Sequence, residues 1–177
     1  LPLWVLHAHA HAAAVVSPIL ALSSPQKRSG KTTTLSLLGA LTPRPLTAAS
    51  ISPAAVFRTV ERYVPTLLLD EADAVFSVND ELRCLFNASH SRAAAVVVRV
   101  VGEQLEPRVF STWCPKAVAL IGDLPGTLED RAILLPMRRR RRDEAVTRLR
   151  WDRLGELEPV RRRAWRWAQD HLEALRV

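Results

Sequence analysis

The sequence predicts an α/β fold with three layers, in which helices cover a mainly parallel five-stranded sheet. Two observations predict it. A short apolar run at residues 19–22 leads into a polar loop and then a helical pattern, and a second, largely apolar run at residues 65–69 ends in Asp70 and Glu71. Strands of parallel sheets are buried on both faces and therefore have such continuous apolar sequences. Further apolar runs along the chain supply the remaining strands.

Composition fits a globular protein. Of the 177 residues, 48% are hydrophobic and 24% are charged, which is typical of globular domains. No apolar run reaches the length of about 20 residues that a membrane-spanning helix needs, so we expect no membrane partner. Cys84 and Cys114 are far apart and have no Cys or His at ligand spacing, which favours a reduced, cytoplasmic location. His7, His9 and His11 alternate, but residues two apart do not share a helix face, so a metal site is not predicted there.

The first predicted site is the stretch of residues 24–32, here called the GKT loop. It lies between a strand at about 18–22 and a helix that runs to about Ala40, and it ends in Gly30-Lys31-Thr32. Strand, loop, Gly-Lys-Thr and helix form the layout of a phosphate-binding P-loop, whose backbone N–H groups converge on an anion. Lys31 is expected to reach the β- and γ-phosphates of ATP, and the Thr32 hydroxyl to ligate Mg²⁺. The predicted nucleotide-binding residues are Pro25, Gln26, Lys27, Arg28, Ser29, Gly30, Lys31, Thr32 and Thr33.

One position departs from the P-loop pattern. Pro25 stands where the pattern G-x-x-x-x-G-K-[ST] has its first glycine. Proline has a fixed φ and no N–H group, so the entry to the loop must be built differently. The alternative is a chance Gly-Lys-Thr beside a helix, because short motifs recur often.

The second predicted site follows the strand at about 65–69. A short strand at about 46–49 and a helix capped by Ser52 with Pro53 at its first position precede it. Asp70 is expected to hold Mg²⁺ through water, and Glu71 to polarise the attacking water. A capping Asp after a buried strand is the alternative, but the Gly-Lys-Thr sequence about forty residues earlier weakens it, because two independent motifs then agree.

A hairpin is predicted between this site and the next core strand. After a helix at about 79–87, residues 95–101 and 108–113 are expected to pair as two strands around a polar turn. Such an insertion at about 95–113 can project from the core and touch single-stranded DNA, with Arg99 and Arg108 on phosphates. The alternative is a structural hairpin with solvated arginines, and two Glu residues in the turn argue against phosphate contacts at its tip.

The core is predicted to close with strands at about 117–121 and 132–136, joined by a helical turn. Arg131 lies just before the last strand. There an arginine can reach the γ-phosphate of a neighbouring subunit as an arginine finger, which implies a homo-oligomer, possibly a ring. The alternative is an Arg131 that pairs with Glu129 or Asp130 at the surface.

Residues 1–142 are predicted to form the core, and residues 143–177 to begin a helical region with helices at about 143–154 and 157–176. Because the chain starts at Leu1 and ends in a helical pattern, we expect a fragment of a longer protein. Arg138–Arg142 is a run of five arginines, and the net charge is +7. An excess of positive charge favours a nucleic-acid partner. Codon bias is the competing explanation, since nearly all basic residues are arginine.

Four motifs together resemble one family: Ser24–Thr32, Leu69–Asp73, Phe110–Ala117 and Leu124–Arg131. It is the family of phage and bacterial P-loop proteins that carry domain of unknown function 3631, whose members often look like the ATPase half of primase–helicases. The resemblance covers nearly the whole chain. It implies an AAA+-like ATPase of the ASCE group of P-loop NTPases, with ATP and Mg²⁺ as cofactors and a sheet order of 5-1-4-3-2.

The function expected from these motifs is an ATP-hydrolysing motor, a DNA helicase or translocase module in which Lys31, Glu71 and Arg131 are catalytic. One alternative is an ATP-driven switch that remodels or assembles proteins without touching nucleic acid. A third reading is a degenerate scaffold that binds nucleotide without hydrolysing it, and the departure of Pro25 from the P-loop pattern is compatible with it. Intact Lys31, Asp70 and Glu71 favour hydrolysis over both a scaffold and a kinase.

Overall fold

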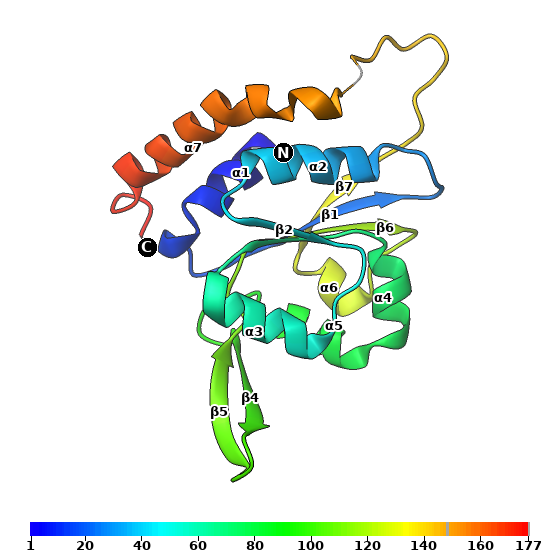
Figure 1. Ribbon diagram of the computed structural model, residues 1–177. Helices are drawn as coiled ribbons and strands as arrows, with labels where there is room; N and C mark the ends of the chain where they lie inside the picture. The colour runs from blue at the N-terminus through cyan, green and yellow to red at the C-terminus, as the bar shows by residue number, and fades with distance from the viewer. Residues whose placement is uncertain (148, 177) are drawn as a thin grey trace.

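A central sheet organises the chain in the computed structural model, which describes residues 1–147 and 149–176 (Figure 1). Its five strands all run parallel, in the order β2-β3-β6-β1-β7. In chain order they are β1 (Ile19–Ser24), β2 (Pro45–Ala48), β3 (Thr66–Leu69), β6 (Lys116–Ile121) and β7 (Ala132–Pro136). The predicted α/β class with a parallel five-stranded sheet is confirmed, and so is the strand order that the resemblance implies.

Burial follows position in the sheet. All residues of β3 and nearly all of β1 and β6 are buried, because these three strands lie inside the sheet and helices cover both faces. The edge strand β7 is more open, with Ile133 at 48% and Leu134 at 43% exposure. The continuous apolar sequences that predicted the inner strands therefore reflect burial on both faces.

Three helices and two short 3₁₀ turns cover one face of the sheet, the upper one in Figure 1. They are α1 (Pro2–His9), η1 (His11–Ala13), α2 (Lys31–Leu41), η2 (Trp151–Leu157) and α7 (Glu158–His171). Trp4 and Leu35 pack there against Leu20, Leu22 and their sheet neighbours. The helix that begins at Lys31 is thus fixed to β1, the inner strand from which the GKT loop emerges.

Four helices cover the opposite face: α3 (Pro53–Tyr63), α4 (Ala72–Val78), α5 (Asp80–Ala88) and α6 (Gly126–Glu129). The predicted cap of α3 is confirmed, since the Ser52 hydroxyl accepts a hydrogen bond from the Ala55 N–H at 3.2 Å. Phe76 and Phe86 are almost fully buried and meet edge to face, with ring centroids 5.2 Å apart. These rings join α4 and α5 to the larger of the two cores.

The predicted hairpin forms a separate two-stranded antiparallel sheet, β4 (Val96–Val101) and β5 (Glu106–Ser111). It projects away from the body of the molecule below α3 (Figure 1). One face packs on the core through Phe110 and Val97. The other face carries exposed valines, among them Val98 at 55% and Val100 at 59% exposure.

One predicted helix is absent among the described residues, and one helix was not predicted. Residues 143–147, 149 and 150 are not helical, and the 3₁₀ helix η2 begins only at Trp151. The Glu144 carboxylate accepts hydrogen bonds from the Arg138 guanidinium and from the Arg141 N–H, which fixes a turn where a helix was expected. The helix predicted at about 79–87 is confirmed as α5, and Asn79 caps it by accepting from the Leu82 N–H at 2.9 Å. The sequence did not predict α4, which precedes it.

No helix among residues 1–147 and 149–176 is both long and apolar enough to cross a membrane.

Candidate functional site

The GKT loop leaves the inner strand β1 and turns into α2 through Gly30. Gly30 has φ +87°, a conformation that costs residues with a side chain about 1–2 kcal/mol. Behind it, the ammonium group of Lys31 donates to the Ser24 hydroxyl at 2.6 Å and to the Ser29 hydroxyl at 3.4 Å. Lys31 is only 9% exposed, so the loop folds around its lysine.

Two hydroxyl groups build the entry to the loop, where Pro25 replaces a glycine. The Ser24 hydroxyl donates to the Gln26 carbonyl at 2.8 Å, and the Ser29 hydroxyl donates to Ser24 Oγ at 2.8 Å. Pro25 and Gln26 are exposed at the turn. Side-chain hydrogen bonds therefore close a turn that the missing glycine would otherwise form with its backbone.

The two predicted motifs meet in space. The Thr32 hydroxyl donates to Asp70 Oδ2 at 2.7 Å, although the residues are 38 positions apart. The other carboxylate oxygen, Oδ1, accepts from the Glu71 N–H at 2.9 Å. Strands β1 and β3 end at the same edge of a parallel sheet, where ligands of such sheets bind, and β6 lies between them.

A cavity of about 420 Å³ opens between these motifs. Its lining combines three cationic and three acidic side chains with residues from the end of β6: Lys27, Arg28, Lys31, Thr32, Asp70, Glu71, Asp73, Ala74, Ala119 and Ile121. Cationic groups and a helix N-terminus on one wall and carboxylates on the other suit a phosphate chain with a divalent cation.

Two residues of the lining have left-handed backbone conformations. Arg28 has φ +63° and Glu71 has φ +52°. Residues with a side chain pay of order 1–3 kcal/mol for such conformations, which cluster at functional sites. The turn at Glu71 also begins α4, so the carboxylate is presented at the exposed start of that helix.

The residues present fit Mg²⁺ bound together with a phosphate chain. Mg²⁺ is usually held by one or two protein oxygens together with substrate phosphates, and Thr32 Oγ1 and Asp70 Oδ2 are adjacent oxygens of this kind. No cluster of three or more His, Cys, Asp or Glu side chains able to hold a metal alone occurs in the described residues. Of the nine predicted loop residues, four line this cavity (Lys27, Arg28, Lys31 and Thr32), and five do not (Pro25, Gln26, Ser29, Gly30 and Thr33). Thr33 lines a neighbouring cavity of about 470 Å³ with Thr34 and residues of η2.

Arg131 is not brought into this site. It precedes β7 at the edge of the sheet opposite the GKT loop, since its carbonyl accepts from the Ile19 N–H at the start of β1. Its guanidinium donates to the Thr127 carbonyl at 2.6 Å and to Asn87 Oδ1 at 3.4 Å. No ion pair with Glu129 or Asp130 forms in the part of the chain that the structure describes, so the alternative of a surface pairing is wrong.

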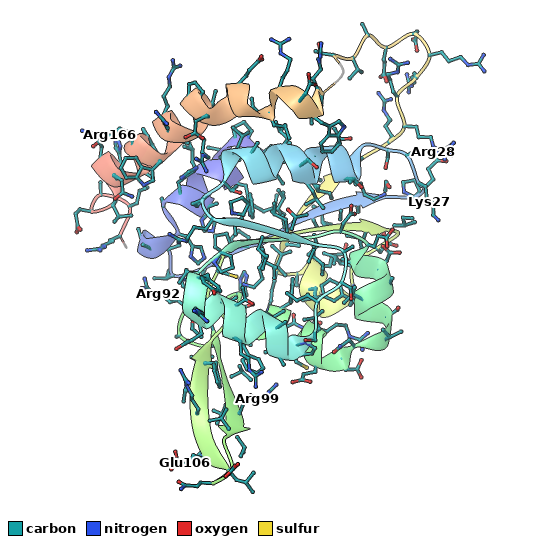
Figure 2. All side chains as sticks on the ribbon, in the orientation of Figure 1. Lys27, Arg28, Arg92, Arg99, Glu106 and Arg166 are labelled. Carbon is teal, nitrogen blue, oxygen red and sulfur yellow. The ribbon has the colours of Figure 1, made fainter. Side chains whose placement is uncertain are left out.

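The hairpin arginines lie on the face turned to the body. Arg99 forms an ion pair with Glu81 of α5 and lies over the Phe57 ring, 5.4 Å from its centre. Arg108, the partner of Arg99 across the hairpin, lies over Phe110 at 4.8 Å. Figure 2 shows Arg99 near the base of the hairpin and Glu106 at its far end. Arg99 is thus engaged within the chain, and this favours the structural reading of the hairpin over the predicted phosphate contacts.

Three residues that the sequence did not single out support the site. Ser24 holds Lys31, as described above, and Asp73 Oδ1 accepts from the Ile121 N–H at 3.1 Å, tying α4 to the end of β6. The Arg139 guanidinium donates through Nε to the Lys27 carbonyl at 2.8 Å, across 112 positions of sequence. The position of Asp73, three residues after Asp70, could have indicated its role. Nothing in the sequence pairs Arg139 with the GKT loop.

Lys116 and Cys114 form a second buried group, remote from the GKT loop at the start of β6. The Lys116 ammonium donates to the Cys114 carbonyl at 2.7 Å. Burial lowers the pKa of Lys116 and raises the pKa of the Cys114 thiol. Both groups are enclosed by the sheet and have no opening to the cavity, so they belong to the core.

Comparison with models of protein families and with curated proteins found no match to this chain.

Proposed function

We propose that this chain is a P-loop NTPase domain that binds ATP with Mg²⁺ at the cavity between the GKT loop and the end of β3 and hydrolyses it. The observation that carries the proposal is the contact of Thr32 with Asp70 at 2.7 Å beside Lys31. It joins a predicted phosphate loop and a predicted acidic pair into one site. A chance Gly-Lys-Thr would have no reason to meet an Asp-Glu pair at the same sheet edge.

Each residue then has a role. Lys31 and the N–H groups at the start of α2 bind the β- and γ-phosphates. Thr32 and Asp70 hold Mg²⁺, which neutralises phosphate charge when bound. Glu71 orients the attacking water and accepts its proton as a bond forms from the water oxygen to the γ-phosphorus and the bond to the β–γ bridging oxygen breaks. Arg131, at the far edge of the sheet, serves the site of a neighbouring subunit in a homo-oligomer.

Steady-state ATP hydrolysis tests this proposal. Glu71→Gln is expected to lower kcat by about 10²–10⁴-fold, the usual contribution of a general base, while nucleotide still binds. Lys31→Ala is expected to abolish both nucleotide binding and hydrolysis. Glu103→Gln makes the same chemical change on an exposed carboxylate of the hairpin turn and should leave the rate unchanged. Full activity in Glu71→Gln would contradict the assigned role.

The work that hydrolysis drives is proposed to be movement on DNA, as the resemblance to primase–helicases implies. Single-stranded DNA should then stimulate hydrolysis. One observation favours the alternative, an ATP-driven switch acting on a protein: the outer hairpin face is apolar, with Val96, Val98, Val100 and Val109 each about half exposed. Hydrolysis that depends on Lys31 but is indifferent to DNA would support that alternative.

A further inference from the structure

The positive charge of the chain is concentrated beside the candidate nucleotide site. Eight of the 25 Lys and Arg residues belong to the GKT loop or to the run that follows β7: Lys27, Arg28, Lys31 and Arg138–Arg142. Without these eight, the remaining basic residues and the 18 acidic residues almost cancel. Codon bias would scatter arginines over the surface, and it does not explain their accumulation at one place.

The run is held against the GKT loop. The Met137 N–H donates to the Ser23 carbonyl at 2.7 Å, which extends the pairing of β7 with β1 past the end of the strand. Two residues later the Arg139 guanidinium donates to the Lys27 carbonyl at 2.8 Å. Figure 2 shows Lys27 and Arg28 at the outer end of the loop, where the segment after β7 passes. The chain thus crosses the loop before it turns away to η2.

The arginines of the run differ in their partners. Arg138 forms an ion pair with Glu144, and this pairing lowers the pKa of Glu144 to about 2. Arg140 adds a weaker electrostatic effect on the same carboxylate. Among the described residues, however, no ion pair joins Arg140, Arg141 or Arg142 to an acidic side chain, and all three are exposed.

The arginines of α7 show the contrast. Arg161 and Arg162 both pair with Glu158, and Arg166 pairs with Asp170. Arg161, Arg162 and Arg166 therefore each have an acidic partner within their own helix. Arg166 lies on the side of the molecule opposite Lys27 and Arg28 (Figure 2).

We propose that Arg140, Arg141 and Arg142, with Lys27 and Arg28 beside them, form a surface that binds the phosphate backbone of single-stranded nucleic acid. Guanidinium groups without acidic partners neutralise phosphates and release counterions, which is the main source of sequence-independent affinity. Five residues span at most about 18 Å, the length of several successive nucleotides in a strand. The run carries no aromatic or large apolar side chain to anchor it in a lipid surface.

Arg139 connects this surface to the GKT loop, because its neighbours bind the strand while its own guanidinium holds the Lys27 carbonyl. This connection rests on the proposed ATP hydrolysis, whereas the binding surface does not. A strand on the run is expected to stabilise the loop in the conformation that receives phosphate. Arg139 is in this sense a positioning residue.

Binding of a fluorescein-labelled oligo(dT) of 20 nucleotides, measured by anisotropy between 50 and 200 mM salt, tests the surface. Replacing Arg140, Arg141 and Arg142 together by Gln removes about three phosphate contacts. At about 0.7 per contact for single strands, the slope of log K against log salt should become flatter by about 2, and affinity at 0.1 M salt should fall on the order of 100-fold. The matched control replaces Arg161, Arg162 and Arg166 by Gln, which changes net charge equally but removes arginines that already have acidic partners.

Equal losses in the two triple variants would overturn the proposal, since net charge alone would then explain binding. The proposal would also be overturned if the parent protein bound vesicles of anionic lipid but not the oligonucleotide. It would likewise be overturned if replacing Arg140, Arg141 and Arg142 by Gln left oligonucleotide binding unchanged. Unfolding by urea at the parent midpoint would confirm that the exposed substitutions leave the fold intact.

Arg139→Gln tests the connection. It should leave oligonucleotide affinity and its salt dependence close to those of the parent, because Arg139 holds the Lys27 carbonyl and is not one of the contact residues, but it should remove the stimulation of ATP hydrolysis by DNA. Retained stimulation would overturn the positioning role. If the parent does not hydrolyse ATP at all, the proposed function fails, while the anisotropy measurement still decides on the surface.

Discussion

His11 is predicted to make the fold sensitive to acid. Its ring is 6% exposed, its Nε2 lies 2.9 Å from the Ser17 hydroxyl, and it packs against Trp113 with centroids 4.4 Å apart. Burial, reinforced by the nearby charges of His7, Lys116 and Arg92, lowers the pKa of His11 from 6.5 to about 3. In the unfolded chain the pKa returns to the ordinary value, so the unfolded state takes up a proton first as the pH falls.

The change in stability with pH follows from this difference between the folded and unfolded pKa of His11. The contribution of a neutral His11 to stability is complete above pH 6.5 and is lost as the pH falls from 6.5 towards about 3. At pH 5 the loss is about 2 kcal/mol, since each unit below the unfolded pKa costs about 1.4 kcal/mol. That is a sizeable part of a total stability of about 5–15 kcal/mol.

Urea unfolding at pH 7 and pH 5 measures this effect. His11→Gln keeps a polar group for Ser17 but cannot titrate, so between the two pH values it should lose about 2 kcal/mol less than the parent. Burial lowers the pKa of His7 and His9 as well, but those contributions are common to both proteins and cancel in the difference. His171→Gln changes an exposed histidine and should keep the parent's pH dependence. The same dependence in His11→Gln and the parent would refute the reasoning.

Three further predictions concern the site and the core. Gly30→Ala should lower the free energy of unfolding in urea by about 1–2 kcal/mol and weaken nucleotide binding, because φ at this position is +87°. The added Cβ meets only Met137 Cε at 3.6 Å, so backbone strain and not a clash is the cause. A stability equal to that of the parent would show that the loop relaxes freely. Phe86→Ala, at a fully buried ring, should cost about 3–5 kcal/mol, and a loss under 1 kcal/mol would contradict the packing described. Arg131→Ala should bind nucleotide yet fail to hydrolyse it, and mixing it with Lys31→Ala protein should restore part of the activity; an inactive mixture would argue against a role in trans.

The sequence predicted the sheet well because its strands carry their own signal. Residues 19–22 and 67–69 are continuously apolar, which is typical of strands buried on both faces. The contact of Thr32 with Asp70 could be anticipated for the same reason, since both residues follow inner strands of one parallel sheet. The cap at Ser52 was likewise visible, because a Ser before a Pro and an apolar helix is a local signal.

What the sequence did not predict depends on contacts between distant residues. The bond of Arg139 to the Lys27 carbonyl joins an arginine run to a loop 112 positions away, and no periodicity marks it. The turn at Glu144 replaces an expected helix because one carboxylate binds both Arg138 and the Arg141 N–H. The sequence left phosphate contacts and a structural hairpin open as readings of Arg99, and the structure favours the second, since Arg99 pairs with Glu81 and lies over Phe57.

The most direct test of the proposed nucleotide site is calorimetric binding of ATP with and without Mg²⁺, comparing the parent with Thr32→Val. Thr32→Val keeps the shape of the side chain but removes the hydroxyl that meets Asp70 at 2.7 Å. If the GKT loop and the Asp-Glu pair form one nucleotide site, the parent should bind ATP more tightly with Mg²⁺ than without it, and Thr32→Val should lose that difference. Binding that is equally tight with and without Mg²⁺ in both proteins, or no binding by the parent, would show that the two motifs do not form a site for ATP with Mg²⁺.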